Sequence, residues 1–264
     1  VLFGNRLVDL FGENHKLNPE LTRLERDSYR QVRGTWREKP KGPKSLTRSE
    51  VIEKLDREGL LPAITFIFSR NNCDAAVRQC LAAGIRLTNS QERSSIREVV
   101  AKNIKSLAEE DLVVLGYYEW ADALERGVAA HHAGLLPAFK VTVEELFQRG
   151  LIKAVFATET LALGINMPAR TVVLEKLSKW NGEGHVAISP GEYTQLTGRA
   201  GRRGIDIEGN AVILWGNELD STSVGGLAST RTYPLKSSFK PTYNMSINLI
   251  SQFGSDKART SLES

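Results

Sequence analysis

Five short apolar runs constrain the fold of this 264-residue chain more than any other feature of its sequence. The runs are ITFIF at 64–68, VAA at 128–130, KAVFA at 153–157, TVVL at 171–174 and AVILW at 211–215. They are rich in β-branched and aromatic residues and hardly alternate with polar ones. This composition is typical of strands that are buried on both faces, as in a parallel sheet.

Helical patterns separate these runs. Residues 74–83, 90–104 and 111–126 predict helices, and a further helix is expected from Thr47 or Ser49 to Glu58. In 138–149, the apolar residues Phe139, Val143 and Leu146 recur at helical spacing before Gly150. The alternation of strands and helices predicts an α/β fold with a doubly wound parallel sheet.

Ligands of such sheets bind in the loops beyond the carboxyl ends of the strands. The loops after the predicted strands contain Ser69 and Arg70, the segment 131–134, and the segment 158–160. The glycine- and arginine-rich segment TGRAGRRG, residues 197–204, is expected at the same edge. Hydroxyls, charges and glycines therefore predict one ligand-binding edge.

The segment TGRAGRRG has the composition of a phosphate-binding loop. Glycine allows a close backbone approach and a positive φ, and arginine donates two hydrogen bonds to phosphate oxygens. Arg199 and Arg202 are three residues apart, so in a helical turn they would project from one face. The alternative is a solvated basic turn or a nonspecific nucleic-acid patch.

Three other features leave alternatives open. Thr158 and Thr160 follow a predicted strand, where a helix N-terminus could bind an anion or Thr158 could simply cap the helix. The neighbours His131 and His132 face opposite ways on a strand, so a phosphate or base contact is expected there and no metal site is. Cys73 and Cys80 fit neither a metal nor a disulfide pattern; we expect small buried side chains and a cytoplasmic or other reducing compartment.

Charge and missing motifs narrow the function. The formal net charge of +4 suits a nucleic-acid partner, although many proteins without one are as basic. The sequence contains no G-x-x-x-x-G-K-[ST] phosphate loop, no Asp-Glu pair and no apolar run long enough to span a membrane. If the chain handles ATP, it offers half a site. It begins with Val1 and stops soon after an apolar run, so a piece of a longer protein is expected.

Four segments in order resemble helicase motifs. FIFSR (66–70) is similar to motif IV, GVAAHHAGLLP (127–137) to the segment before motif V, ATETLALGINMPARTVV (157–173) to motif V, and EYTQLTGRAGRRG (192–204) to motif VI. Together they resemble the second RecA-like domain of superfamily-two DExH helicases of the superkiller-like group, which includes exosome-associated RNA helicases. SSFKPTYNMSINLI (237–250) resembles this group's passage into a winged-helix domain.

The resemblance implies a RecA-like parallel sheet flanked by helices, without the phosphate loop of the first motor domain. It implies three parts: an interdomain segment at 1–45, the RecA-like domain at 46–220, and a linker with the start of a winged-helix module at 221–264. Residues 1–35 read as a short β-like opening and a charged segment. Residues 36–48 and 216–240 read as linkers or loops.

The resemblance also implies residue roles. Arg199 and Arg202 would be arginine fingers for ATP, which a first RecA-like domain holds with Mg²⁺, and Gln195 would sense the same phosphate. Arg203 is a less certain finger and would serve an internal ion pair. Gly164, Asn166 and Gly198 would line the ATP cleft. A track for single-stranded RNA or DNA would comprise Ser69, Arg70, His132, Gly134, Thr158 and Glu159.

The function implied is the C-terminal motor domain of an ATP-dependent RNA helicase, with the isolated fragment inactive. A DNA helicase of the same superfamily and a noncatalytic nucleic-acid-binding module are the alternatives.

Overall fold

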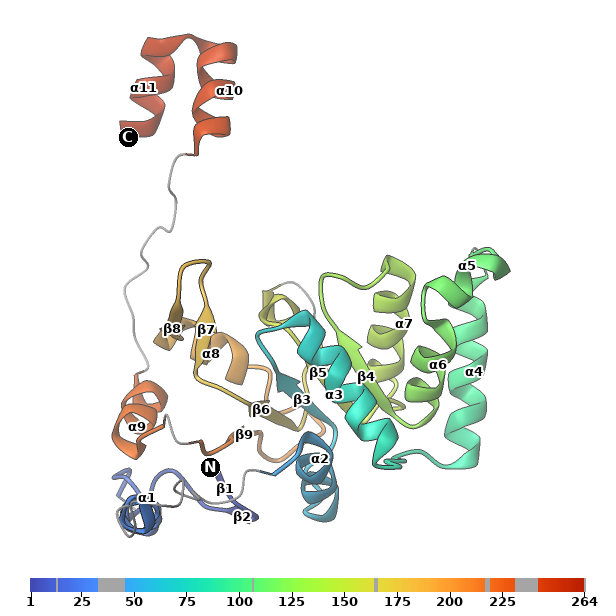
Figure 1. The fold of residues 1–264 in the computed structure, drawn as a ribbon, viewed down its shortest axis with the longest axis vertical. Coiled ribbons are helices and arrows are strands. Elements are labelled where there is room, and N and C mark those ends of the chain that lie inside the picture. The colour runs from blue at the N-terminus through green and yellow to red at the C-terminus, as the bar shows by residue number, and fades with distance from the viewer. Residues whose placement is uncertain are drawn as a thin grey trace. The chain divides into compact units, whose positions relative to one another are not determined.

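The computed structural model describes residues 1–12, 14–32, 46–105, 107–163, 166–216, 219–230 and 242–263 (Figure 1). Its internal contacts divide the chain into two units, residues 1–231 and 232–264, and each is described by itself. The larger unit is built on a central sheet, and the predicted sites all fall within it.

The central sheet has five parallel strands, which confirms the predicted fold class. The strands are β3 (Ala63–Phe66), β4 (Val128–His131), β5 (Ala154–Ala157), β6 (Thr171–Leu174) and β9 (Asn210–Ile213). Their order across the sheet is β4-β5-β3-β6-β9. All five predicted runs form strands of this sheet, so the carboxyl ends of neighbouring strands meet at one edge.

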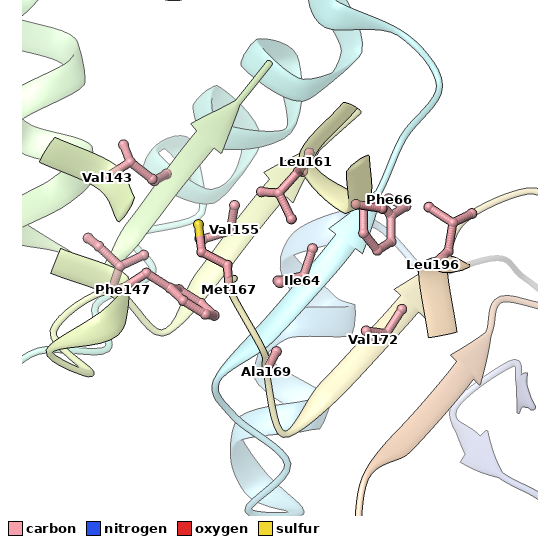
Figure 2. Close-up of a cluster of buried hydrophobic side chains, with 14 of the residues drawn as sticks. Ile64, Phe66, Val143, Phe147, Val155, Leu161, Met167, Ala169, Val172 and Leu196 are labelled. Atoms are coloured by element: carbon pink, nitrogen blue, oxygen red, sulfur yellow. The ribbon is translucent and has the colours of Figure 1, made fainter. Parts of the chain in front are cut away.

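Both faces of the sheet are covered by apolar packing. On one face, Ile64, Phe66 and Val172 pack with side chains of several helices (Figure 2). Those elements are α4 (Ser90–Ile104), α7 (Pro137–Gln148), the 3₁₀ turn η1 (Glu159–Leu163), α8 (Pro190–Thr197) and α9 (Ser221–Ser229). On the other face, Ala63, Phe156 and Val173 pack against α2 (Arg48–Arg57) and α3 (Arg70–Ala82). This two-sided burial explains why the strand sequences hardly alternate.

The predicted helices form, with one difference. Thr47 caps α2 and exchanges hydrogen bonds with Glu50 in a capping box, as its sequence position indicates. The helix expected over 111–126 is instead split into α5 (Glu109–Val114) and α6 (Tyr117–Glu125). Gly116 separates them with a φ of 67°, a left-handed conformation that ends the first helix.

The N-terminal residues pack on the β9 edge of the sheet. They form a hairpin of β1 (Leu2–Phe3) and β2 (Arg6–Leu7), and the backbone N–H of Trp215 donates to Leu2 O at 3.0 Å. The charged segment that follows contains α1 (Pro19–Val32), which the sequence analysis did not predict. The predicted basic loop at 36–48 lies largely outside the described residues.

Several elements outside the central sheet follow β6 in the larger unit. A hairpin of β7 (Ser178–Trp180) and β8 (His185–Ala187) leads into α8. The helix α9 occupies part of 216–240, where the prediction of a linker was wrong.

In the second unit, α10 (Tyr243–Phe253) is followed by α11 (Ser255–Glu263). Within the described part of the chain, no helix has the length and apolar character needed to cross a membrane.

The two cysteines are packing residues, as predicted. Cys73 and Cys80 are free thiols, fully buried on α3. Burial raises the pKa of each thiol to about 12, so both remain protonated at neutral pH. They therefore fill space between α3 and the sheet.

Candidate functional site

Six predicted site residues gather at the carboxyl ends of three neighbouring strands. Ser69 and Arg70 follow β3, His132 and Gly134 follow β4, and Thr158 and Glu159 follow β5. We call these six residues the strand-end cluster. Because β4, β5 and β3 are adjacent and parallel, the predicted gathering at this edge is confirmed (Figure 1).

The β3 part of the cluster is the N-terminus of α3. The Ser69 hydroxyl accepts a hydrogen bond from the backbone N–H of Asn72 at 3.4 Å and caps this helix. Arg70 is the first residue of the helix and is exposed. A helix N-terminus with an exposed guanidinium favours an anion such as a backbone phosphate.

His131, the last residue of β4, and His132, which follows it, point to opposite faces of the sheet, as predicted. His131 Nε2 lies 2.8 Å from Glu144 Oε1 on α7, and His132 Nε2 lies 3.0 Å from Asp74 Oδ1 on α3. The two imidazoles therefore contact different carboxylates on different helices. Among the residues that the structure describes, no three His, Cys, Asp or Glu side chains gather as a metal site.

His132 shapes the turn after β4. The backbone N–H of Gly134 donates to His132 Nδ1 at 3.1 Å, so Nδ1 carries no proton and Nε2 donates to Asp74. A Cβ atom on Gly134 would lie only 3.2 Å from this Nδ1 atom and 3.6 Å from Arg70 Cδ. The buried imidazole therefore positions the turn beside Arg70. Asp74, which fixes the imidazole, was missed by the sequence analysis because nothing in the sequence pairs it with β4.

The β5 part of the cluster is a short 3₁₀ turn. The helix considered after Thr158 is a 3₁₀ turn, since η1 is five residues long and begins with a hydrogen bond from the Leu161 N–H to Thr158 O. The Thr158 hydroxyl lies 3.0 Å from the Thr160 hydroxyl. Glu159 Oε2 lies 2.6 Å from Lys179 Nζ on β7. The side chains after β5 are thus engaged within the domain.

Residues 197–204, the Gly-Arg loop, lie at the opposite edge of the sheet. The backbone N–H of Ala169, just before β6, donates to Arg199 O at 2.9 Å, and Gly201 N–H donates to Ala169 O at 2.7 Å. The prediction that this loop joins the carboxyl edge was wrong. The helix α8 returns the chain from that edge to the amino end of β9, because β9 is parallel to β6.

Arg199 and Arg202 do not project from one helical face, which corrects the second expectation for this loop. Ala200 forms a β-bridge with Ala169, and Gly201 has a φ of 88°, so the chain is not helical between the two arginines. A Cβ atom on Gly209 would lie 2.5 Å from the Gly201 backbone nitrogen. The loop is therefore fixed by close backbone contacts on both sides.

Each arginine has its own intramolecular partner. Arg199 Nη2 donates to the carbonyl oxygen of Ala162 in η1. Arg202 Nε and Nη2 each donate to the Asp206 carboxylate at 2.8 Å, and the Arg202 backbone N–H also donates to it at 2.9 Å. These hydrogen bonds hold the pKa of Asp206 down at about 2. The sequence analysis missed Asp206.

The internal ion pair expected of Arg203 belongs to Arg202. Arg203 is exposed and makes no ion pair among the described residues. A guanidinium has five N–H donors, so the Asp206 carboxylate leaves three on Arg202 for another acceptor. One guanidinium can thus bind Asp206 and a phosphate oxygen at the same time.

The remaining predicted cleft residues lie near the same loop, with one exception. Gln195 is exposed in the last turn of α8, Gly198 follows that helix, and Asn166 is exposed shortly before Ala169. Gly164 lies outside the described residues. These placements leave Gln195 and Asn166 accessible to a ligand at the amino edge.

A cavity of about 980 Å³ opens elsewhere in the larger unit, at the carboxyl ends of β6 and β9. Leu177, Ile188 and Trp215 line it, together with Arg48 and Glu175, which form an ion pair at 2.8 Å. The cavity contains none of the predicted site residues. It is therefore separate from the strand-end cluster and the Gly-Arg loop.

Comparison with known proteins identifies a matching family. Residues 85–204 match the model of the helicase conserved C-terminal domain. The chain is 58% identical to the probable helicase HelY of Mycobacterium tuberculosis, in an alignment that covers all of this chain and 31% of that relative.

Two eukaryotic relatives are more distant. Identity is 38% to the antiviral helicase SKI2 of Saccharomyces cerevisiae, over 79% of this chain and 16% of the relative. It is 39% to the human exosome RNA helicase MTR4, over 80% of this chain and 20% of the relative. The chain thus spans less than a third of the length of these curated relatives.

Proposed function

We propose that this chain, whose residues 85–204 match the helicase conserved C-terminal domain, is the second RecA-like motor domain of a longer, superkiller-like ATP-dependent RNA helicase. One observation carries the proposal. A single domain presents an exposed arginine at a helix N-terminus in the strand-end cluster, at one edge of its sheet, and oriented arginines at the other. Those two features match the two tasks of a motor domain, which are strand binding and ATP hydrolysis.

Arg202 and Arg199 are proposed as arginine fingers. Arg202 is held by Asp206 with three N–H donors left over, so it can meet a phosphate without losing its internal partner. Ile205 and Ile207 are exposed beside it, as suits a surface that another domain covers. Charge developing on a transferring phosphoryl group is stabilised by such arginines, which contribute about 10³–10⁵ in rate.

The donor set of the Gly-Arg loop fits a phosphate but not a magnesium ion. The arginines and Gln195 offer hydrogen-bond donors, whereas the Asp206 carboxylate is committed to Arg202. ATP supplies the phosphoryl group for transfer when it is bound. We assign the holding of ATP and Mg²⁺ to a first RecA-like domain, so that closure of the two domains gates hydrolysis.

The strand-end cluster is proposed as part of the track for single-stranded RNA. Arg70 and the N-terminus of α3 would bind backbone phosphates, together with the turn that His132 positions at Gly134. Thr158 and Glu159 would lie beside them. Contacts to backbone rather than bases give binding that tolerates any sequence. We propose RNA rather than DNA as the substrate because the human relative MTR4 is named as an RNA helicase.

ATP turnover by the full-length protein and by this 264-residue chain tests the proposal. We expect the full-length protein to hydrolyse ATP faster when single-stranded RNA is added, and the isolated chain to hydrolyse none. Strand-stimulated ATP turnover by the isolated chain would refute the proposal that another domain must hold ATP and Mg²⁺. Stronger stimulation by DNA than by RNA would favour a DNA helicase, and strand binding without turnover by the full-length protein would favour a noncatalytic module.

A further inference from the structure

Lys179 connects the strand-end cluster to the helix that precedes the Gly-Arg loop. On the strand β7, its Nζ atom lies 2.6 Å from Glu159 Oε2 and 2.5 Å from Glu192 Oε1. Glu159 belongs to the strand-end cluster, and Glu192 lies in the first turn of α8. One ammonium therefore bridges carboxylates from two separate elements.

The charge on this bridge is stable at neutral pH. Burial disfavours the charged form of Lys179, but the hydrogen bonds that Lys179 donates to Glu159 and Glu192 outweigh burial and raise its pKa. The Lys179 side chain is 21% exposed, whereas the side chains of Glu159 and Glu192 are 42% and 34% exposed, so water screens the bridge in part. The three side chains together carry one excess negative charge, to which an incoming phosphate would add.

Glu192 fastens the bridge to α8. Its other carboxylate oxygen accepts hydrogen bonds from the Ser189 backbone N–H and the Ser189 hydroxyl, both at 2.7 Å. Glu192 and Ser189 form the capping box that starts α8. A displacement of Lys179 is therefore passed to the start of the helix whose other end carries Gln195 and leads to Arg199.

A second contact joins the far ends of the same two elements. Arg199, just after α8, donates to the Ala162 carbonyl oxygen near the end of η1. Between the two contacts, Leu161 of η1 and Leu196 of α8 lie on either side of Phe66 (Figure 2). All three side chains are buried. The turn η1 and the helix α8 are thus linked at both ends and packed on one core residue.

We propose that the bridge from Glu159 through Lys179 to Glu192 transmits strand binding to the arginine fingers. This inference rests on the proposed helicase function. A strand bound at Thr158 and Glu159 shifts the start of η1, and Lys179 carries that shift to α8 and so to Gln195 and Arg199. Such a chain of packed and charged groups is a physical route for coupling two sites. Lys179 is a positioning residue in this scheme and touches neither ligand.

Strand stimulation of ATP turnover in the full-length protein tests the coupling. Lys179→Met removes the charge and keeps the length of the side chain. We expect its turnover without strand to stay within about twofold of wild type, and its stimulation by saturating single-stranded RNA to fall about fivefold or more, the range of ordinary allosteric coupling. Lys179→Arg retains the charge and is expected to recover most of the stimulation.

Lys153→Met is the matched control. Lys153 Nζ lies 2.9 Å from Glu92 Oε1, and the Lys153 side chain is 26% exposed. Lys153 therefore forms a comparable ion pair away from the strand-end cluster and the Gly-Arg loop. Its stimulation should equal that of wild type. Equal stimulation of Lys179→Met and wild type would overturn the proposal. A second pattern would also overturn it: Lys179→Met loses turnover without strand as well, and it unfolds at a lower temperature than Lys153→Met. That pattern indicates a structural role.

A double-mutant cycle separates coupling from simple damage. If the route runs through the Lys179–Glu192 pair, Lys179→Met combined with Glu192→Gln should reduce stimulation no further than the more damaging single change. Additive losses would contradict the route. Absence of any strand-stimulated turnover in the wild-type protein is a different result: it would remove the proposed function itself, and the coupling with it.

Discussion

The strand-end cluster and the Gly-Arg loop occupy opposite edges of one sheet and are placed by different means. Residues of the strand-end cluster follow β3, β4 and β5 directly, so the sheet itself aligns them. The Gly-Arg loop follows a helix and precedes β9, so α8 and the bridge to Ala169 place it. A residue at the end of a strand inherits its position from the sheet, whereas a residue after a helix depends on what that helix packs against.

The two regions also differ in how they hold charge. Arg70 in the strand-end cluster is exposed at a helix N-terminus. Arg202 in the Gly-Arg loop is fixed at two guanidinium nitrogens, Nε and Nη2, by a carboxylate that is only 5% exposed. A flexible cation suits a strand that slides, and a fixed one suits a single phosphate in a defined place. Substitutions and acid should therefore affect the two regions differently.

Removing the carboxylate that orients Arg202 should lower ATP hydrolysis strongly. In the full-length protein, we expect Asp206→Ala to lower kcat about 10- to 100-fold, or roughly 1.4–2.7 kcal/mol, with strand affinity unchanged. Steady-state turnover and strand titration measure the two quantities. Asp122→Ala, which breaks the Asp122–Arg126 pair at the same sequence spacing on α6, is the control and should leave kcat unchanged. An unaltered kcat in Asp206→Ala would show that Arg202 needs no orientation.

A methyl group added at Gly209, where the chain packs against the backbone of the Gly-Arg loop, should destabilise the fold. A Cβ atom on Gly209 would lie 2.5 Å from the Gly201 nitrogen, closer than real Cβ contacts allow. We expect Gly209→Ala to lower the free energy of unfolding by about 1–3 kcal/mol, as overpacking does. Gly216→Ala, where the added carbon meets open space, should change it little. Urea unfolding of the two variants compares them, and equal values would contradict the tight crossing.

Neutralising the exposed cation of the strand-end cluster should weaken strand binding alone. We expect Arg70→Gln to reduce affinity for single-stranded RNA about tenfold and to lower the salt slope of binding by about 0.7, the value for one lost phosphate contact on a single strand. Turnover at saturating strand should remain normal. Arg78→Gln, further along the exposed side of α3, is the control. An unchanged salt slope in Arg70→Gln would remove Arg70 from the track.

Acid should weaken the Arg202–Asp206 ion pair of the Gly-Arg loop only at low pH. The hydrogen bonds from Arg202 lower the pKa of Asp206 from 3.8 to about 2, so its stabilising effect is complete above about pH 4 and is lost as the pH falls from 4 to 2. Unfolding free energies of wild type and Asp206→Asn should differ by about 2 kcal/mol at pH 7 and converge as the pH falls from 4 to 2. A difference that does not change with pH would contradict the ion pair.

The sequence predicted the sheet well because burial on both faces leaves a strong local pattern. Each of the five apolar runs became a strand, and residues directly after β3, β4 and β5 fell together at the carboxyl edge. The Gly-Arg loop was misplaced because its position depends on α8 crossing back over the sheet. Its sequence position, just before AVILW rather than after a strand, was the signal that could have placed it.

Partners distant in sequence could not be predicted. Asp74 orients His132 across 58 positions, and Lys179 joins Glu159 to Glu192 through a hairpin. Neither spacing corresponds to a helix or strand period, so only the packed fold reveals them. Asp206 is four residues from Arg202, but the local sequence did not indicate whether Arg202 or Arg203 would take the carboxylate.

The central claim is that the Gly-Arg loop supplies an arginine to ATP held elsewhere. Strand-stimulated ATP turnover of the full-length protein with Arg202→Ala, compared with Arg203→Ala, tests it most directly. We expect a loss of about 10³-fold or more for Arg202→Ala with strand binding intact, and nearly normal turnover for Arg203→Ala. Normal turnover in Arg202→Ala, or an equal loss in both variants, would contradict it.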